Sequence, residues 1–597
     1  DATGCVKSTC FNMRKAGYTV HVISDCVTSY DLKKIDEMLT YYAEKGCEVT
    51  GRTALPCRMV LEAGGESAAS EGTDHFFVLP EREAVLYVNG VCRGKRRFAP
   101  QTGTEVWAES GFARVFPNTP PGRKSIALCA PRGGRVSFQL CARSVKPEDL
   151  ALKAGAFTSE RGKIGPGCIS LRHNRYIWLD RPSDTVIRDG EHLIASEIPC
   201  EGPLPGLWAD VLVPCDRLRI SPDRTEALWA DIRVPEDAPP GLYRGRIFAG
   251  SGAVSVSLRV YPVRLPEGGG LKCSFSFVES LARKVMGKDF SPRKAAEFLR
   301  SCGLDYHDAG STGTETGYHA SSFVLTNAAE EEDGLYTLYN PPGAYDASFL
   351  RRFAQRLEKP YAFLLERGMA DKAYVYGFDE RGPEYYGAIK KTFGMVHSRF
   401  PGLKTLSTAV IPPEICPFDM GIDAYVALDG RLSREQMKMQ KEKGGEYWWY
   451  VCGNRRFAVE NTLISDRLLF WQTKREGLDG FFYWALNFWD KEDNSPLEQE
   501  RSEYVFDISG GPCHGDGRLL YPGENGAILS SPRFEQILLG LEDHRLLSLY
   551  EEKYGAKKTR ALIDSLCPGT GAYHTDPGAF DKARRQLLEG LGNKEKL

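Results

Sequence analysis

The sequence predicts a multidomain protein in which a β-sandwich is followed by a (β/α)8, TIM-like barrel, with a short α/β remnant at the N-terminus. Three observations support this prediction. The chain has 597 residues, which is more than one hydrophobic core normally organises. Residues 126–266 alternate apolar and polar side chains with a period of two, as half-buried strands do. Beyond residue 270, short apolar runs alternate with helix-like segments, as in β/α repeats.

The composition is that of a soluble globular protein, with 42% hydrophobic and 26% charged residues. The formal net charge is −2, so nothing indicates nucleic acid or an anionic membrane surface as a partner. No stretch approaches the roughly 18 consecutive apolar residues of a membrane-spanning helix, so we expect none. The sequence gives no indication of the oligomeric state.

Cysteine usage favours a reducing compartment. The 17 cysteines are scattered singly, without a Cys-x-x-Cys pair or a His/Cys cluster at metal-binding spacing. Because their number is odd, we expect reduced thiols in a cytosol-like setting, and neither a metal nor an organic cofactor is implied. The chain begins at Asp1 without a basic-then-apolar leader, so we expect its natural start to be missing. This leaves the localisation undetermined, with the cytoplasm favoured.

Residues 1–50 combine a helix-like run, a strand at 18–24 and an amphipathic run at 31–44. This segment resembles the C-terminal part of the isochorismatase-like cysteine hydrolases, with Cys5 at the position of their nucleophile. The Asp and Lys partners of that family lie upstream of the cysteine and would precede Asp1. A thiol without activating neighbours is a poor nucleophile, so we expect a catalytically inactive remnant.

Residues 51–125 are rich in turn-forming residues and predict short strands. Residues 126–266 predict a β-sandwich, because two segments alternate apolar residues with polar or small ones. The alternating apolar residues are Val136, Phe138, Leu140 and Ala142 in the first segment, and Val254, Val256, Leu258 and Val260 in the second. This alternation is typical of antiparallel sheets with one buried face. A Pro/Gly-rich linker at 266–270 ends the sandwich.

Residues 271–560 predict the barrel, followed by a helical tail at 561–597. One helix is marked by Ser291 as its cap, Pro292 in its first turn and Gly303 past its end. Eight short runs have the length and composition of strands, the number that a (β/α)8 barrel requires. These runs are 272–277, 304–307, 323–326, 373–378, 404–410, 422–428, 446–452 and 478–485.

Two adjacent carboxylates, Asp379 and Glu380, end the fourth of these runs, and Gly382-Pro383 follows them. Barrel enzymes keep their catalytic groups at the C-terminal ends of the strands, which makes this pair the leading candidate for chemistry. Neighbouring strand residues point to opposite faces, so both can reach one ligand only if the strand twists or ends there. The alternative is a solvated pair, or a charge at the N-terminus of the next helix.

Aromatic residues on and after the last two strands are candidates for sugar binding. Because alternate residues face the barrel interior or the helices, about half of them are expected to be packing residues. The residues nearest the strand ends, Tyr450, Tyr483, Trp484 and Trp489, are the better candidates. The predicted substrate-binding set is Tyr376, Trp448, Tyr450, Tyr483, Trp484, Asn487 and Trp489. The glycine-rich loop 515–523 lacks a lysine at phosphate-binding spacing and is expected to be a rim loop or a simple turn.

The order of sandwich, linker and barrel resembles glycoside hydrolase family 123 over roughly residues 110–555. The motifs that carry the resemblance are Tyr-Val-Tyr-Gly-Phe-Asp379-Glu380, Tyr447-Trp-Trp-Tyr-Val-Cys-Gly, Arg467-Leu-Leu-Phe-Trp-Gln, Gly480-Phe-Phe-Tyr-Trp and Gly515-Asp-Gly-Arg-Leu-Leu-Tyr-Pro-Gly. The resemblance implies a β-N-acetylgalactosaminidase that works by substrate assistance, an exception to the usual scheme of two enzyme carboxylates. A related group of uncharacterised proteins shares the C-terminal domain.

In that mechanism the acetamido oxygen of the substrate is the nucleophile and closes an oxazolinium ring. The resemblance implies that Glu380 is the acid and then the base, and that Asp379 orients the acetamide N–H. Tyr450 and Tyr483 would supply polar contacts to the sugar. The implied partner is a glycan or glycoconjugate substrate.

Three alternatives remain open. The first is a conventional glycosidase whose second carboxylate comes from another strand end, such as Asp305, Asp308 or Asp429. The second is a non-catalytic carbohydrate-binding protein that keeps the aromatic cleft, against which the intact Asp379-Glu380 pair counts. The third is a cysteine hydrolase through Cys5. The configuration of the sugar at C4, its linkage and the natural glycan are not specified by the sequence.

Overall fold

The structure is a computed structural model with two compact units, Asp1–Thr102 and Gly103–Leu597, each of which is described by itself. In the second unit it describes residues 103–179, 183, 186–189, 192–195, 202, 206–222, 224–266, 270–304, 322–329, 331–332, 335–336, 340–452, 455–489, 506–507, 514–569 and 572–592. In the first unit it describes residues 21–23, 35–45, 47–50, 75–78, 83–88 and 91–97. No helix among these residues is both long enough and apolar enough to cross a membrane.

The first unit contains a parallel strand pair and a small antiparallel sheet. Strands β1 (His21–Ile23) and β2 (Glu48–Thr50) pair in parallel, and helix α2 (Ile35–Glu44) lies between them in sequence. Met38 and Tyr42, four residues apart on one face of α2, are buried. Strands β3 (His75–Val78), β4 (Glu83–Val88) and β5 (Val91–Arg97) form an antiparallel meander. Cys5 lies outside the described residues.

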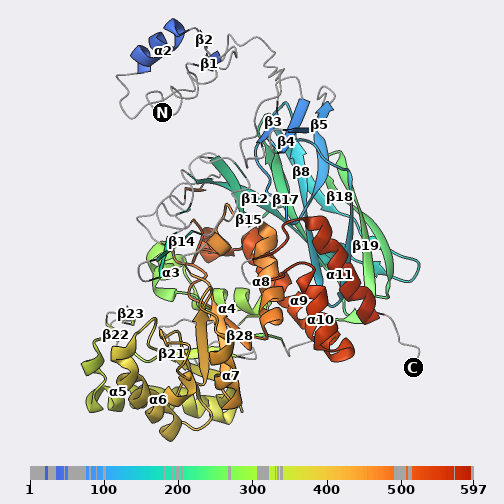
Figure 1. Cartoon of the computed structure of the whole chain (residues 1–597). Coiled ribbons are helices and arrows are strands. Elements are labelled where there is room, and N and C mark those ends of the chain that lie inside the picture. The colour runs from blue at the N-terminus through green and yellow to red at the C-terminus, as the bar shows by residue number, and fades with distance from the viewer. Residues whose placement is uncertain are drawn as a thin grey trace. The chain divides into compact units, whose positions relative to one another are not determined.

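Two mainly antiparallel sheets form the sandwich (Figure 1). One has the order β15-β12-β17-β8-β6 and the other β11-β10-β18-β19-β7, with β9 pairing β18 and β16 pairing β9. The strands of the first sheet are β6 (Glu105–Ser110), β8 (Arg135–Arg143), β12 (Ile169–Leu179), β15 (Gly206–Pro214) and β17 (Glu226–Arg233), and β29 (Phe506–Asp507) pairs β12. The strands of the second are β7 (Ser125–Arg132), β9 (Glu148–Ala154), β10 (Phe157–Thr158), β11 (Lys163–Ile164), β16 (Arg217–Ile220), β18 (Gly241–Ala249) and β19 (Gly252–Arg264). β6 precedes the predicted start of the sandwich at residue 126, and its Val106 and Ala108 lie in the sandwich core.

The apolar residues predicted from the period-two pattern are buried between the two sheets. The expectation of a single buried face is wrong for β8, because Ser137, Gln139 and Cys141 on its other face are also buried. There the amide of Gln139 donates to the carbonyl of Ala113 at 2.6 Å, so the polar side chain is satisfied by the chain that covers it. The alternation in the sequence correctly predicts that this face is polar, but it does not predict that the face is buried.

The C-terminal part contains a nearly closed, barrel-like sheet of seven parallel strands in chain order. These strands are β20 (Lys272–Phe275), β21 (Phe323–Asn327), β24 (Ala373–Tyr376), β25 (Lys404–Ser407), β26 (Ala424–Leu428), β27 (Glu446–Tyr450) and β28 (Gly480–Tyr483). Beside β20, the amide of Cys273 donates to the hydroxyl of Ser322, the residue before β21, at 3.0 Å. Seven of the eight predicted runs therefore contain strands, and the run 304–307 extends beyond the described residues after Leu304.

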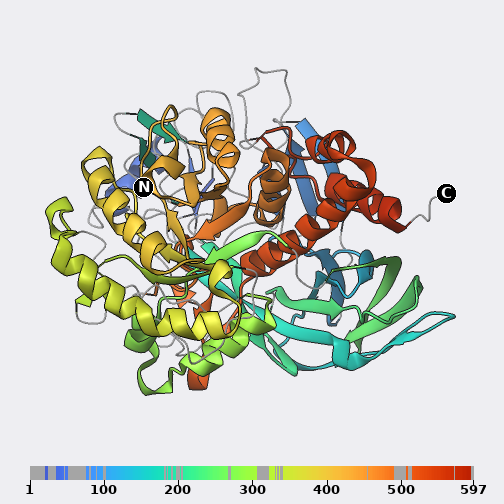
Figure 2. The same ribbon diagram turned by 90° about the horizontal axis from the view of Figure 1, so that it is seen from below.

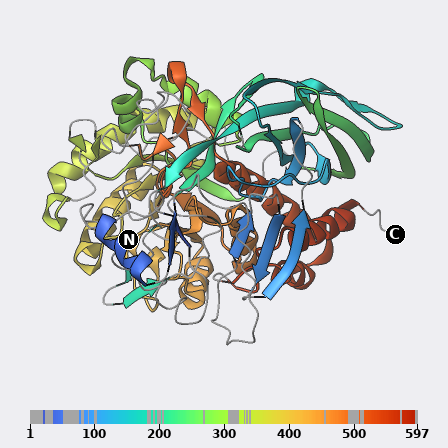
Figure 3. The same cartoon turned by 90° about the horizontal axis from the view of Figure 1, so that it is seen from above.

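Helices connect these strands and cover the outer face of the sheet. They are α3 (Glu279–Met286), α4 (Pro292–Ser301), α5 (Ala347–Glu366), α6 (Tyr386–Arg399), α7 (Arg434–Glu442) and α8 (Leu463–Glu476). The predicted cap of α4 is present, since Ser291 accepts a hydrogen bond from the amide of Lys294. Figures 2 and 3 show α5 and α6, in yellow, on the side of the parallel sheet away from the sandwich strands. Short hairpins β13 (Val186–Asp189) with β14 (His192–Ala195), β22 (Glu331–Glu332) with β23 (Leu335–Tyr336), and β30 (Tyr521–Pro522) with β31 (Ile528–Leu529) complete the described strands.

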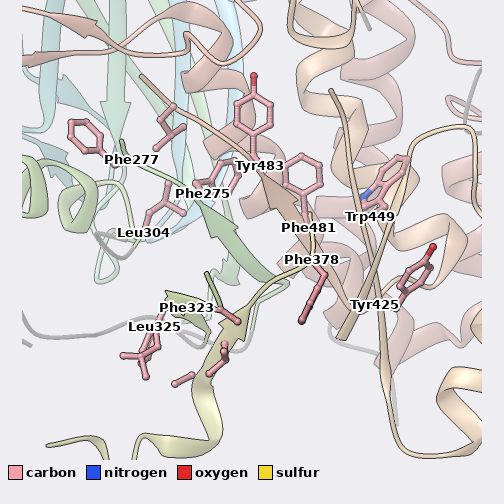
Figure 4. Close-up of a cluster of buried hydrophobic side chains, with 14 of the residues drawn as sticks. Phe275, Phe277, Leu304, Phe323, Leu325, Phe378, Tyr425, Trp449, Phe481 and Tyr483 are labelled. Carbon is pink, nitrogen blue, oxygen red and sulfur yellow. The ribbon is translucent and has the colours of Figure 1, made fainter. Parts of the chain in front are cut away.

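Alternate residues of the parallel strands face the interior of the sheet or the helices. The inward-facing side chains, named here the interior cluster, are Val324, Tyr374, Tyr376, Leu406, Ala424, Val426, Trp448, Tyr450 and Phe482. The outward-facing ones join the helices in a larger core, part of which Figure 4 shows. There Phe481 lies on β28 with Phe275 and Trp449 on either side, at ring-centroid distances of 5.6 and 6.5 Å. The inner and outer faces are thus both filled by large aromatic side chains.

Helices after the last barrel strand link the parallel sheet to the sandwich. α9 (Pro532–Tyr554) packs with α8, α10 (Ala556–Asp564) and α11 (Pro577–Gly592) in a core that also includes Phe112 and Leu265. At the start of α9, the buried guanidinium of Arg533 donates to the buried carboxylate of Asp210 on β15 at 2.7 Å. A charge-assisted pair of this kind fixes α9 against the sandwich.

Candidate active site

Asp379 and Glu380 lie on a tight turn that follows β24. The strand ends at Tyr376, two residues earlier than the sequence predicts, and Phe378 and Glu380 have positive φ angles of 60° and 51°. Such angles cost of the order of 1–3 kcal/mol per non-glycine residue and occur where the surroundings fix the backbone. This turn breaks the strand alternation, which would otherwise send the two carboxylates to opposite faces.

Hydrogen bonds from the backbone and from nearby side chains hold this strained turn. The amide of Gly377 donates to the carbonyl of Leu406 at 3.1 Å, and the hydroxyl of Ser407 donates to the carbonyl of Gly377 at 2.8 Å. The side chain of Arg381 donates from Nε to the carbonyl of Asp379 at 2.9 Å. β25 and its C-terminal extension therefore brace the turn on which the carboxylates are displayed.

Each carboxylate has one oxygen bonded to the hydroxyl of an interior tyrosine. Tyr376 donates to Oδ1 of Asp379, and Tyr450 donates to Oε1 of Glu380. Thr408 Oγ1 donates to the same Oδ1 at 2.8 Å. No residue that the structure describes bonds Oδ2 of Asp379 or Oε2 of Glu380. Asp379 is half-buried and Glu380 is exposed. Each group therefore has one fixed oxygen and one oxygen that remains available to a ligand.

The two tyrosines remain neutral hydrogen-bond donors. Burial, and next the negative charge of Asp379, raise the pKa of Tyr376 well above its ordinary value. Burial, and next the charge of Glu380, raise the pKa of Tyr450 in the same way. A phenol that keeps its proton can only donate to a carboxylate oxygen, so these contacts fix the orientation of both acidic groups.

Thr408 is a site residue that the sequence reasoning missed. Its hydroxyl, besides donating to Asp379, accepts a hydrogen bond from the amide of Glu380 at 3.2 Å and lies 2.9 Å from the hydroxyl of Tyr376. It follows β25 directly, at the same edge of the sheet as the carboxylates. The sequence could have indicated this residue, because Thr408 lies just past the end of the strand that is parallel to and neighbours β24.

The remaining predicted binding residues are distributed over different environments. Trp448 is fully buried in the interior cluster and donates from Nε1 to Glu446 Oε2 at 2.9 Å, at the N-terminal end of the strand. Phe482, also in the interior cluster, stacks on Tyr376 with ring centroids 5.2 Å apart. Trp484 is partly exposed and packs against the interior cluster at the C-terminal end of β28. Tyr376 and Tyr450 are therefore the predicted residues that contact the carboxylates, and Trp484 lies at the same end of the parallel strands.

Tyr483, Asn487 and Trp489 face other parts of the chain. The hydroxyl of Tyr483 donates to Asp516 Oδ1 at 2.8 Å, and its ring lies in the core outside the parallel sheet (Figure 4). The Asn487 side chain bonds both backbone groups of Val278, at 2.7 and 3.0 Å. The indole of Trp489 donates to the carbonyl of Leu520 at 2.8 Å. In the structure these three side chains connect loops at the rim of the sheet.

The structure provides little support for the other candidate carboxylates or for a metal site. Asp429, at the C-terminal end of β26, accepts a hydrogen bond from Arg456 Nε at 2.8 Å. Asp305 and Asp308 lie outside the described residues. The described part of the chain contains no cluster of three or more His, Cys, Asp or Glu side chains that could hold a metal ion.

Comparisons with known proteins match both regions of the second unit. Residues 310–550 match the catalytic-domain model of glycoside hydrolase family 123, and residues 110–249 match the N-terminal-domain model of the same family. Residues 1–54 match the isochorismatase domain, in agreement with the resemblance noted for residues 1–50. No curated protein matches the chain.

Among solved structures, the chain is similar to a family 123 glycoside hydrolase from Clostridium perfringens that was analysed for glycolipid glycan hydrolysis. The TM-score is 0.60 at 15% identity, and the match covers 82% of this chain and 98% of that chain. A β-glucuronidase from glycoside hydrolase family 2 matches with a TM-score of 0.17 at 9% identity, covering 59% of this chain and 31% of that chain. A membrane-anchored protein from Corynebacterium diphtheriae matches with a TM-score of 0.14 at 12% identity, covering 31% of this chain and 44% of that chain. These last two scores are too low to support an argument.

The sandwich, the parallel sheet with its carboxylate pair and the two domain models agree on one assignment. The chain belongs to glycoside hydrolase family 123.

Proposed function

We propose that this glycosidase removes β-linked N-acetylgalactosamine, or a related N-acetylhexosamine, from a glycan by retaining, substrate-assisted hydrolysis. The observation that carries the proposal is the state of Asp379 and Glu380. Two adjacent carboxylates each have one oxygen fixed by a tyrosine and one oxygen without a partner among the described residues. Substrate assistance needs two enzyme groups with different tasks, and this pair supplies them.

The first step is assigned to Glu380. Its carboxyl group gives a proton to the glycosidic oxygen while the bond from that oxygen to the anomeric carbon breaks. The acetamido oxygen of the same sugar attacks the anomeric carbon from the other face and closes a five-membered oxazolinium ring. Exposure of Glu380 gives it access to the leaving group, and the hydrogen bond from Tyr450 orients it.

Asp379 would act on the acetamide nitrogen. Positive charge develops on that nitrogen as the ring closes, and a carboxylate that accepts the N–H hydrogen bond stabilises it. The two hydroxyls of Tyr376 and Thr408 engage Oδ1, so Oδ2 is the oxygen that can meet the substrate. Because the carboxylate is held before the substrate arrives, little reorganisation is needed during the reaction.

Water completes the cycle. Glu380, now a carboxylate, takes a proton from water as the oxygen attacks the anomeric carbon, and the oxazolinium ring opens to restore the acetamide. Two inversions at the anomeric carbon give net retention. The reaction consumes one water molecule and regenerates the proton on Glu380, so no second enzyme carboxylate is required.

A conventional mechanism would need a second free carboxylate, about 5–5.5 Å from the acid in a retaining enzyme and about 6.5–9.5 Å from it in an inverting one. Asp429 is the candidate from the neighbouring strand ends that the structure describes, and its pairing with Arg456 makes it a poor nucleophile. The Clostridium perfringens enzyme analysed for glycolipid glycan hydrolysis adds support from a protein of similar fold. We therefore favour a glycan or glycoconjugate, of which a glycolipid is one kind, as the natural substrate.

The decisive experiment compares 4-nitrophenyl β-N-acetylgalactosaminide with the plain β-galactoside, using wild type, Glu380→Gln and Asp379→Asn. Hydrolysis of the acetamido substrate alone, reduced in both variants, is the expected result. Equal hydrolysis of both substrates would overturn substrate assistance and favour a second carboxylate. Binding of the sugar without hydrolysis of either substrate by folded wild type would favour a carbohydrate-binding protein. Thiol alkylation should leave the activity unchanged, which excludes a role for Cys5.

A further inference from the structure

We propose that Trp484 and Phe488, named here the aromatic shelf, bind the sugar ring that adjoins the residue being removed. This inference rests on the proposed function and extends it to the part of the glycan beyond the cleaved bond. Phe488 was not among the predicted binding residues.

The shelf lies at the same end of the parallel strands as the carboxylate pair. Trp484 directly follows β28, at the C-terminal end of the parallel strands where Asp379 and Glu380 also lie, and it packs against the interior cluster. Phe488 extends the shelf outward, with its ring centroid 5.1 Å from that of Trp484 and an angle of 60° between the ring planes. Trp484 is partly exposed and Phe488 is exposed, so solvent reaches both side chains of the shelf.

Phe488 is exposed although the chain around it is firmly fixed. Its side chain is 44% exposed, whereas its amide donates to the carbonyl of Gly517 at 2.7 Å and its carbonyl accepts from Arg518 Nε at 2.8 Å. Burying a large apolar side chain lowers the free energy of the folded protein, so the exposure of Phe488 does not contribute to stability. A backbone fixed by these hydrogen bonds holds the exposed ring in one place, as a binding platform requires.

The glycine-rich loop is shaped to fit the shelf. Gly517 has a φ of +73°, and a Cβ atom there would lie 2.5 Å from the ring of Trp484 and 3.1 Å from Cβ of Phe488. The buried Arg533 donates to the carbonyls of Gly515 and Arg518 at 2.8 and 2.7 Å, which anchors the loop. The loop therefore supports both rings closely, in a way that any side chain at position 517 would prevent.

The chemistry of the shelf fits a pyranose ring. One face of a pyranose presents C–H groups, which pack on an aromatic face, while its hydroxyl groups stay in water at the rim. Two rings cover far less than the roughly 800 Å² per partner of a stable protein interface, so a second protein is a poor occupant. A single sugar ring matches the size of the shelf, and the shelf lies at the end of the strands that carries Asp379 and Glu380.

The test compares two substrates that share the cleaved sugar. Methyl β-N-acetylgalactosaminide has no adjoining ring, and a β-N-acetylgalactosaminyl-galactose disaccharide has one. Phe488→Ala should lower kcat/KM for the disaccharide about tenfold, as expected for loss of an aromatic anchor, and change the methyl glycoside less than about twofold. Phe488→Tyr should keep the activity on both. Leu365→Ala, which truncates another exposed apolar residue, on α5, is the matched control and should change neither.

An unchanged ratio of the two kcat/KM values in Phe488→Ala would overturn the inference while leaving the proposed function intact. Failure of wild type to cleave either substrate would overturn the proposed function instead. In that case calorimetric titration with the disaccharide still decides the role of the shelf. Weaker binding to Phe488→Ala than to wild type would support it, and equal binding would overturn it.

Discussion

Carboxylates lie at both ends of the interior cluster, but they differ in the number and charge of their hydrogen-bond partners. At the N-terminal end of the strands, Glu446 accepts hydrogen bonds from Lys272 at 2.6 Å, Lys404 at 2.8 Å, Tyr374 at 2.8 Å and Trp448 at 2.9 Å. At the C-terminal end, Asp379 and Glu380 meet only hydroxyl groups through one oxygen each, apart from the backbone of their own turn. The first carboxylate is saturated by cations and the other two are not.

This difference separates a structural role from a chemical one. Burial acts to raise the pKa of Glu446, but the hydrogen bonds from Lys272 and Lys404 outweigh burial and lower the pKa to about 2. A carboxylate that is permanently charged and fully paired can neither give a proton nor meet a substrate. The N-terminal end of the sheet therefore holds a fully paired ion cluster, whereas Asp379 and Glu380 at the C-terminal end each keep one oxygen without a partner among the described residues. In barrel enzymes the C-terminal end carries the chemistry.

The largest effect is expected from Glu380→Gln on a substrate with a poor leaving group. Loss of a general acid should lower kcat/KM for methyl β-N-acetylgalactosaminide by about 10²–10⁴-fold. The 2,4-dinitrophenyl glycoside needs no proton on its leaving group, so formation of the oxazolinium ring should change much less with it. Single-turnover kinetics on the two substrates measures this contrast. Equal losses on both would rule out a role for Glu380 in proton donation.

Asp379→Asn should reduce kcat for the acetamido substrate by about 10²–10³-fold, the range seen when a group that stabilises transition-state charge is removed. This loss should be independent of the leaving group, because in the proposed mechanism Asp379 acts on the acetamide and not on the glycosidic oxygen. Steady-state kinetics on the same two glycosides checks it, with the melting temperature as a control for folding. If the loss depended on the leaving group, the result would indicate that Asp379 protonates the leaving group and that the roles assigned to the two carboxylates are reversed.

Features that depend on neighbouring residues in the chain could be predicted from the sequence, and features that depend on contacts between distant residues could not. The alternation in β8 and β19 and the carboxylate pair at the end of β24 were visible, because strand periodicity and turn residues are local signals. The sequence did not show which face of the sheet Tyr450 and Tyr483 occupy. Both end a strand, but the parallel register pairs Tyr450 with Phe482, so Tyr450 faces inward and Tyr483 faces the outer core.

Contacts between distant segments were beyond the sequence for the same reason. Thr408 and Asp379 are 29 residues apart, and Lys272 and Glu446 are 174 residues apart. No period or motif within one segment predicts that these groups meet, because the register of several parallel strands has to be known first. The cluster around Glu446 was therefore not predicted at all.

Glu446→Gln tests the other end of the comparison and should affect stability more than catalysis. The change leaves Lys272 and Lys404 facing each other without a counter-charge, and the cost should be about 2 kcal/mol, less than the roughly 3–5 kcal/mol of a fully buried pair. A group whose pKa is lowered on folding stabilises above its unfolded pKa. The stability difference between wild type and the variant should therefore shrink as the pH falls from about 4.5 to about 2. Urea unfolding across this pH range measures the effect, and a difference independent of pH would contradict it.

Thr408→Val should give the smallest effect, about a tenfold fall in kcat with little change in KM, because it removes one of the two hydroxyls that fix Asp379. Thr408→Ser keeps the hydroxyl and should retain activity within about twofold. A double-mutant cycle with Asp379→Asn separates positioning from a general loss of structure. If Thr408 acts through Asp379, its replacement should have little further effect once Asp379 is changed. If the two losses multiply, Thr408 stabilises the turn and does not position Asp379 for the substrate.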